Sequence, residues 1–101
     1  MTPREVLLNA AEMVERGWCQ GMGARNAAGR EVRPTSRAAV CWCAHGAILR
    51  SAKDGVGWLC MEHLARAIGI APCDVTGWND APKRTQAEVV SALKAAAEAC
   101  E

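Results

Sequence analysis

The apolar segment at residues 38–49 limits what this chain can fold into more than any other feature does. A helix drawn through it is apolar or small on every side, and such a helix is buried on most of its faces. Its 12 residues are too few to cross a bilayer. We therefore predict a central helix that has Thr35 or Ser36 as its N-cap, ends near Lys53, and is the most buried element of a small domain.

Three residues of this segment lead to more specific expectations. Trp42 and Cys43 should be largely inaccessible to solvent if the helix is buried all round. Gly46 lowers the stability of a helix unless it serves packing, so we expect a neighbouring segment to approach closely at this residue.

Two capping boxes mark the first and the last helix. Thr2 with Glu5 begins the first helix, and Thr85 with Glu88 begins the last one. In each box the threonine and the glutamate satisfy backbone N–H groups that the first turn of a helix leaves unpaired. Gly17 is expected to end the first helix in the usual C-terminal role of glycine.

The remaining segments are assigned from their helix-breaking residues and from the spacing of their apolar residues. Residues 18–34 are rich in glycine and do not read as helix, although 22–25 and 30–33 could pair as a weak hairpin. An apolar stripe predicts a third helix over 56–68. Residues 70–83 then form a compact connection rich in turn residues.

These elements together predict an all-α fold. The chain of 101 residues is the size of one domain, and half of its residues are hydrophobic, which is enough for one core. We expect a single helical domain over residues 1–101, with four helices and a short β-hairpin or loop insert between the first and second.

The charges are balanced overall but not locally. The net charge of +1 gives no general attraction to nucleic acid or to a membrane. Residues 16–37, however, contain five arginines and only one acidic residue, Glu31. This run is either a solvated face or a site for an anionic partner. The five are Arg16, Arg25, Arg30, Arg33 and Arg37.

The cysteines favour a reduced protein. An even number of cysteines in a short chain raises the possibility of a disulfide framework. No cleavable signal precedes the first helix, and several thiols lie in apolar stripes, where free cysteine behaves as a small hydrophobe. We therefore expect a cytoplasmic protein without structural disulfides. The six are Cys19, Cys41, Cys43, Cys60, Cys73 and Cys100.

A zinc site is the main alternative for these side chains. On helices, Cys41 with His45 and Cys60 with His63 would each share a face, and two such pairs could bind zinc tetrahedrally. The spacing matches no common zinc module, so we expect no metal and no cofactor. Cys43 could instead be a nucleophile if a histidine approached it through tertiary packing, which keeps an enzyme as a further alternative.

Two polar clusters, each led by a tryptophan, are the candidate site. They lie outside the predicted helices, in residues 18–25 and 78–84. Such a cluster is either a structural lock, in which amides satisfy loop backbone groups, or a recognition pocket with aromatic walls. The candidate residues are Trp18, Gln20, Arg25, Trp78, Asn79, Asp80 and Arg84.

We expect the two clusters to meet in space, because each displays polar groups that need partners. A bidentate ion pair between Arg25 and Asp80 is the predicted clamp between them.

The order of these motifs resembles a small uncharacterised domain family found in bacteria, prophages and bacteriophages. The motifs are Gly17-Trp18-x-Gln20-Gly21 with Ala24-Arg25, then Trp42-Cys43-Ala44-x-Gly46-Ala47, then Trp78-Asn79-Asp80-x-x-x-Arg84-Thr85-x-x-Glu88-Val89. The resemblance spans nearly the whole chain. It implies that Trp42, Cys43 and the seven candidate residues form a shared framework, but it carries no established activity. Four of the other cysteines and both histidines lie outside the pattern, namely Cys19, Cys41, His45, Cys60, His63 and Cys73.

The function expected from the sequence is a small binding or interaction module, which could be phage-derived and act on a host or defence component. Its partner would be a protein or a small anionic ligand. The alternatives are a Cys/His-based enzyme or zinc protein, and capture of a phosphate-bearing small molecule by Arg25 and Arg84.

Overall fold

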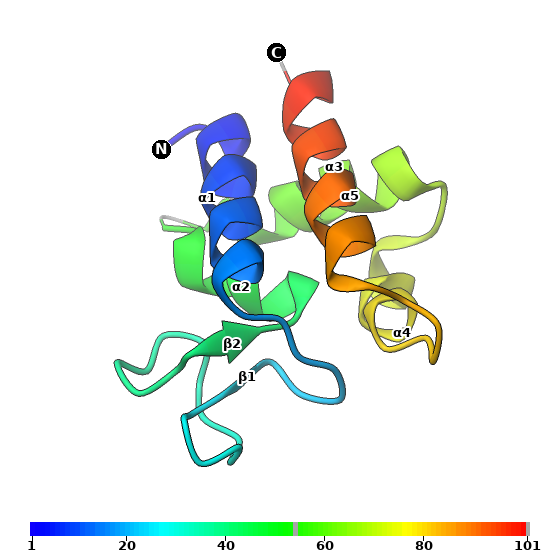
Figure 1. Cartoon of the computed structure of the whole chain (residues 1–101). Coiled ribbons are helices and arrows are strands. Elements are labelled where there is room, and N and C mark those ends of the chain that lie inside the picture. Colours follow the sequence, from blue (N-terminus) through cyan, green and yellow to red (C-terminus); the bar gives the residue numbers. More distant parts are fainter. Residues whose placement is uncertain (54, 101) are drawn as a thin grey trace.

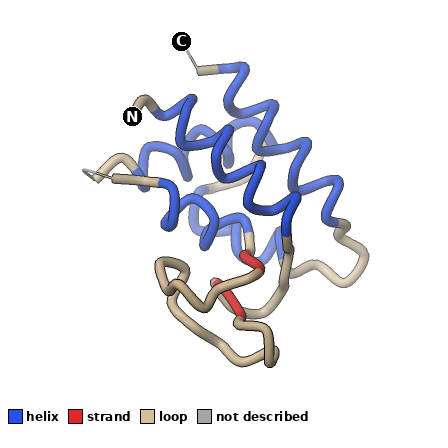
Figure 2. Tube along the Cα trace, turned by 60° about the vertical axis from the view of Figure 1, so that its left-hand side comes forward, coloured by secondary structure: helices blue, strands red, loops and turns tan. Residues whose placement is uncertain are grey.

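The computed structural model describes residues 1–53 and 55–100. Helices dominate this part of the chain, and a small antiparallel sheet of two short strands lies at one end of them (Figures 1 and 2). The expectation of a mostly helical fold is therefore confirmed. The elements in order are α1 (Pro3–Arg16), β1 (Ala24–Arg25), β2 (Cys41–Trp42), α2 (Ala44–Ser51), α3 (Gly57–Ile68), the 3-10 helix η1 (Pro72–Asp74), α4 (Val75–Asn79) and α5 (Gln86–Ala99).

The first and last helices, α1 and α5, lie side by side, and both ends of the chain emerge at the same end of the pair (Figure 1). Both predicted capping boxes are present, with Thr2 and Glu5 at the start of α1 and Thr85 and Glu88 at the start of α5. Gln86 joins the two helices, because its Nε2 donates to the carbonyl of Val14 at 2.6 Å. The side chain of α5 thus satisfies an end carbonyl of α1.

Gly17 follows α1, but the reason for glycine differs from the one expected. Its backbone is extended rather than left-handed, so no positive φ requires glycine here. A Cβ at this position would instead collide with the carbonyl oxygen of Val40 and with Cys41. Gly17 is needed because β2 passes directly against the chain as it leaves α1.

The predicted central helix is much shorter than expected. The helix α2 begins at Ala44, and the residues before it form β2 and a run of turns. Ser36 does not cap a helix, because its hydroxyl accepts the N–H of Ala38 within a turn. The N-cap is Cys43, whose sulfur accepts the N–H of Gly46 at 3.2 Å. The prediction of one helix from residue 35 to residue 53 is therefore wrong at its N-terminal half.

The burial predicted for this segment is correct at its centre but not throughout, because Val40 is 50% exposed and Leu49 is 45% exposed. Trp42 is 7% exposed and Cys43 is 3% exposed, and the whole of Gly46 is buried. A Cβ on Gly46 would collide with the backbone of Gly23, which confirms the expected close approach. The buried residues of this segment belong to β2, the N-cap and α2, which pack against α1 and the other helices.

The predicted hairpin is present only in part. Arg25 forms an isolated bridge with Glu31, as a 22–25 and 30–33 hairpin requires. The strand β1, however, pairs with β2, with Ala24 opposite Trp42. A parallel bridge between Trp18 and Trp42 extends this pairing to the chain just after α1.

The third helix and the connection after it are close to expectation. The helix α3 ends at Ile68, followed by Gly69 with a φ of 76°, which is the left-handed cap that glycine favours. The connection holds η1 and also the short helix α4, where only turns were predicted. Together with α4, the described residues form five α-helices rather than four.

The core lies between α1, α2, α3 and α5, and its fully buried side chains are mostly aliphatic. None of the helices in the described ranges combines the length and the hydropathy that a bilayer crossing requires. All six cysteines are unpaired.

Candidate functional site

The two polar clusters meet, as predicted, although they are about 60 residues apart in the sequence. We call this contact the polar junction and define it by Trp18, Gln20, Arg25, Asn79 and Asp80. Its first half follows α1, and its second half is the end of α4. The junction therefore ties the chain around the sheet to the connection before α5.

Asn79 is the centre of the polar junction. Its side chain is fully buried, with 0% exposure. Its Oδ1 accepts the indole N–H of Trp18 at 2.9 Å and the backbone N–H of Ala44 at 3.0 Å. Its Nδ2 donates to the carbonyl of Cys19 at 3.1 Å and to Asp80 at 3.0 Å. The amide thus uses its full hydrogen-bonding capacity within the protein.

Gln20 and Asp80 complete the contact between the two halves. The Nε2 of Gln20 donates to the carbonyls of Asn79 and Ala81, at 3.0 and 2.9 Å. The Oδ1 of Asp80 accepts the backbone N–H of Gly21 at 2.9 Å. These three bonds each join a polar side chain to a backbone group, which is the arrangement of a structural lock.

The predicted ion pair between Arg25 and Asp80 is wrong. Within the described ranges, the ion pairs join Arg84 to Glu88 and Lys94 to Glu15. Arg25 donates instead to the carbonyls of Gln20 and Gly29, at 3.0 and 3.2 Å. A backbone carbonyl close at hand satisfies the guanidinium without a second charge.

Arg84 and Trp78 form a separate contact beside the junction. The guanidinium of Arg84 lies 4.1 Å from the centre of the Trp78 ring, and its Nε donates to the carbonyl of Trp78 at 2.9 Å. Its Nη1 pairs with Glu88 at 3.2 Å. Arg25 and Arg84 are thus both engaged by protein groups.

The alternative zinc site is not assembled. Cys41 lies in β2 and His45 lies in α2, so the two do not share a helix face as assumed. The sulfur of Cys60 points toward the carbonyl of Pro3 on α1, at 3.9 Å. In the part of the chain that the structure describes, no three His, Cys, Asp or Glu side chains are placed to hold a metal ion.

Cys43 lies in surroundings that oppose a nucleophilic role. Burial raises the pKa of the Cys43 thiol, although the N–H group of Gly46 acts in the opposite direction. Burial also lowers the pKa of His45. A nucleophilic cysteine requires a lowered pKa, so the thiol of Cys43 serves as a helix cap rather than as a poised thiolate.

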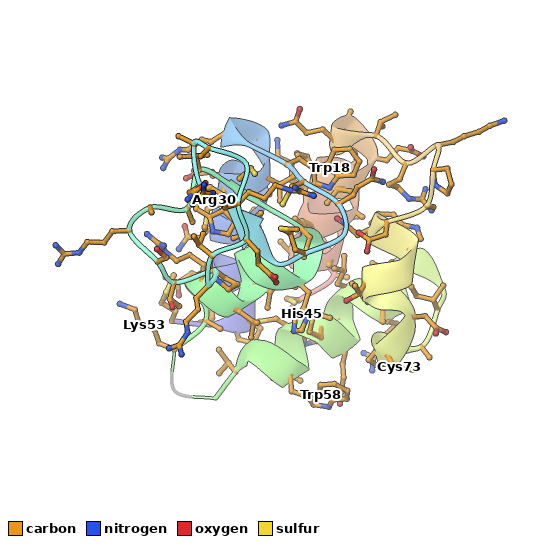
Figure 3. The ribbon with its side chains drawn as sticks, turned by 90° about the horizontal axis from the view of Figure 1, so that it is seen from below. Trp18, Arg30, His45, Lys53, Trp58 and Cys73 are labelled. Atoms are coloured by element: carbon orange, nitrogen blue, oxygen red, sulfur yellow. The ribbon has the colours of Figure 1, made fainter. Side chains whose placement is uncertain are left out.

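The segment at residues 26–40, which we call the arginine loop, carries the exposed charges beside the sheet. Arg30, Arg33 and Arg37 are all exposed on it (Figure 3 labels Arg30). Asn26 shapes its first turn by accepting the N–H groups of Ala28 and Arg30. The loop has no regular secondary structure over its length, yet side-chain hydrogen bonds hold it in place.

Two side chains from outside the loop hold its middle. The indole of Trp42 donates to the carbonyl of Pro34 at 3.0 Å. The Nη1 of Arg50 donates to the same carbonyl at 3.0 Å and to that of Ser36 at 2.8 Å. Sequence reasoning missed Arg50, because no local pattern indicates that a residue in the last turn of α2 reaches back to this loop.

The comparisons with known proteins agree with the expected resemblance. The family model described as "Family of unknown function (DUF6197)" matches residues 1–99. No match was found among curated proteins or among solved structures. The match covers nearly the whole chain, and the prediction of an uncharacterised domain family is confirmed. The chain belongs to the family of unknown function DUF6197.

Proposed function

We propose that this protein is an interaction module that binds an acidic segment of a partner protein through the arginine loop. The observation that carries the proposal is the fixed display of Arg30, Arg33 and Arg37 on a loop held by Trp42 and Arg50. An irregular loop of this length in a compact domain is usually functional.

The distribution of charge supports an acidic partner. Residues 16–53 contain seven of the 12 basic residues of the chain but only one of its 11 acidic residues, Glu31. The small net charge therefore conceals a strongly positive segment. Arginine is well suited to this role, because its planar guanidinium binds a carboxylate with two parallel hydrogen bonds.

A protein segment is favoured over nucleic acid because apolar groups accompany the arginines. Val40 is 50% exposed at the end of the loop, beside the exposed Ala38. Protein interfaces combine apolar contacts with a charged rim, whereas nonspecific nucleic-acid binding depends on phosphate contacts alone.

The polar junction has a supporting role in this proposal. Asn79, Gln20 and Asp80 form their hydrogen bonds within the protein. We therefore propose that the junction holds in place the sheet from which the arginine loop extends. That the module is phage-derived and acts on a host or defence component remains part of the proposal, as does a location in the cytoplasm.

The test is the binding of a labelled polyglutamate peptide, measured by fluorescence anisotropy. The charge-reversal variant R30E/R33E/R37E should weaken binding by at least about tenfold. The matched control is R4E/R66E/K83E, which reverses three exposed charges elsewhere and should bind within about twofold of wild type.

Two outcomes would contradict the proposal. One is an equal loss of binding in both triple variants, which would mean that net charge alone controls the interaction. The other is tighter binding of an oligothymidylate with the same charge as the peptide, lost in the loop variant and steeply dependent on salt, which would make the loop a nucleic-acid site.

A further inference from the structure

A cavity between α1 and the end of α2 has a lining that neither the family match nor the proposed function explains. Its volume is about 290 Å³, near the lower limit for small-molecule sites. Among the described residues that line it, Arg16, Arg50 and Lys53 supply three cations, and Glu12 supplies one carboxylate. Lys53 lies on the same half of the molecule as Arg30 in the view from below, with Cys73 on the other half (Figure 3).

Two chain segments bring these cations together. Glu12 and Met13 lie four and three positions before Arg16 on α1, which places each of them beside Arg16 on the surface of that helix. Arg50 and Lys53 come from the last turn of α2 and the residues after it.

Arg50 is the most strongly positioned of the three cations. Its Nη1 is fixed by the carbonyls of Pro34 and Ser36, and its guanidinium lies 5.9 Å from the centre of the Trp42 ring. Its other nitrogens make no hydrogen bond to a described residue. A guanidinium that is already oriented, with donors to spare, loses little entropy when it binds an anion.

Met13 and Ser51 supply a less polar part of the cavity lining. The hydroxyl of Ser51 is turned toward the sulfur of Met13, at 3.2 Å, and Ser51 is only 8% exposed. The half-buried side chain of Met13 lines the same space. Methionine adapts to apolar groups of varied shape, so the cavity offers an apolar contact at Met13 beside its cations.

We propose that this cavity binds a small phosphomonoester. The three cations and one carboxylate of the described lining leave an excess of two positive charges, which matches the dianion that a phosphomonoester forms above its second pKa of about 6. The organic group of the ligand must be small, and it lies over Met13. This site uses neither Arg25 nor Arg84, and it does not depend on the proposed acidic partner.

The probe is phenyl phosphate, titrated into the ¹⁵N-labelled protein and measured by amide shifts and by calorimetry. The amides of Arg16, Ser51 and Lys53 should shift together and report one affinity. Benzoate, which carries the same ring and a single negative charge, should bind at least about tenfold more weakly. Inorganic phosphate should bind more weakly than phenyl phosphate, because it lacks the apolar group.

Exposed variants provide the decisive comparison, because they leave the fold intact. Arg16→Gln and Lys53→Gln should each weaken phenyl phosphate binding by about tenfold, and Glu12→Gln should tighten it by removing the like charge. The matched control is Arg66→Gln, a change of the same type in the last turn of α3, which should leave the affinity unchanged. Binding should also weaken as the pH falls below about 6, where the ligand becomes a monoanion.

Three results would overturn the proposal. The first is the absence of amide shifts at Arg16, Ser51 and Lys53 on addition of phenyl phosphate. The second is an equal loss of affinity in Arg66→Gln, which would indicate general charge attraction. The third is binding of phenyl phosphate at the arginine loop instead of the cavity. It would be seen as amide shifts at Arg30 and Arg33 that disappear in R30E/R33E/R37E.

Discussion

Arg25 and Asp80 hold opposite sides of one peptide unit. Arg25 donates to the carbonyl of Gln20, and Asp80 accepts the N–H of Gly21, so both bind the peptide between residues 20 and 21. The two charges are thus linked through a polarised backbone group instead of touching each other. This explains how opposite charges can fasten the two halves of the polar junction without forming a buried ion pair.

The coupling between Arg25 and Asp80 should therefore be modest. A double-mutant cycle with Arg25→Ala and Asp80→Ala, measured by urea unfolding, should give a coupling free energy of about 0.5–1 kcal/mol, as expected for residues with a shared partner. A coupling above about 3 kcal/mol would indicate a direct buried ion pair and contradict the geometry.

Asn79 should be the most sensitive polar residue of the fold. Asn79→Ala strands the indole N–H of Trp18, the N–H of Ala44 and the carbonyl of Cys19. An unpaired buried group costs about 1–3 kcal/mol, so the free energy of unfolding should fall by about 3 kcal/mol or more. Asn9→Ala on the exposed face of α1 is the control and should change it by less than about 0.5 kcal/mol. If Asn79→Ala and Asn9→Ala lowered the free energy of unfolding by the same small amount, water would be replacing the lost amide, and the prediction would be wrong.

Gly46 and Gly77 should respond oppositely to alanine. Both lie within helices, where alanine is intrinsically favoured by about 1 kcal/mol. At Gly46 the new methyl group would collide with the backbone of Gly23, and overpacking of this kind costs about 1–3 kcal/mol. At Gly77 the added carbon would meet nothing within 4 Å beyond its chain neighbours and the backbone of its own helix. Thermal and urea unfolding should show destabilisation for Gly46→Ala and no loss for Gly77→Ala; stabilisation by both would contradict the close contact.

The stability of the protein should fall in alkaline solution in part because of Cys19. Burial and the neighbouring Cys41 raise the pKa of the Cys19 thiol to about 12, from 9.0. The folded state then keeps a proton that the unfolded state loses, so the free energy of unfolding declines as the pH rises from about 9 toward 12. Cys19→Ala should reduce this slope, whereas Cys73→Ala, at an exposed thiol, should not. Identical slopes for wild type and Cys19→Ala would show that the thiol ionises alike in both states.

The parts of the fold that were predictable from the sequence depend on local chemistry. Thr2 with Glu5 and Thr85 with Glu88 reach only three residues along the chain, so the pattern alone determines both helix starts. Gly69 ends α3 for the same kind of reason. The wrong element was the start of the central helix. The residues before Ala44 are apolar enough for a helix, but their backbone groups pair with residues 17–25, and no local signal shows this competition.

The candidate site was predictable in part for a related reason. Unsatisfied polar groups in two loops were enough to predict that the loops meet. Their partners were not predictable, because Arg25 and Asp80 could bind each other or the backbone with similar ease. Arg50 and the cavity beside it depend on how α2 sits against α1 and the arginine loop, which only the assembled structure fixes.

The hydrogen bond from Gln86 to Val14 has a consequence for how the protein folds. The helices α1 and α5 that it joins are far apart in the sequence, yet they share the most extensive contact between described helices. Contacts between segments so far apart in the sequence form slowly. The apolar face of α1 is therefore completely covered only late in folding, when α5 packs against it.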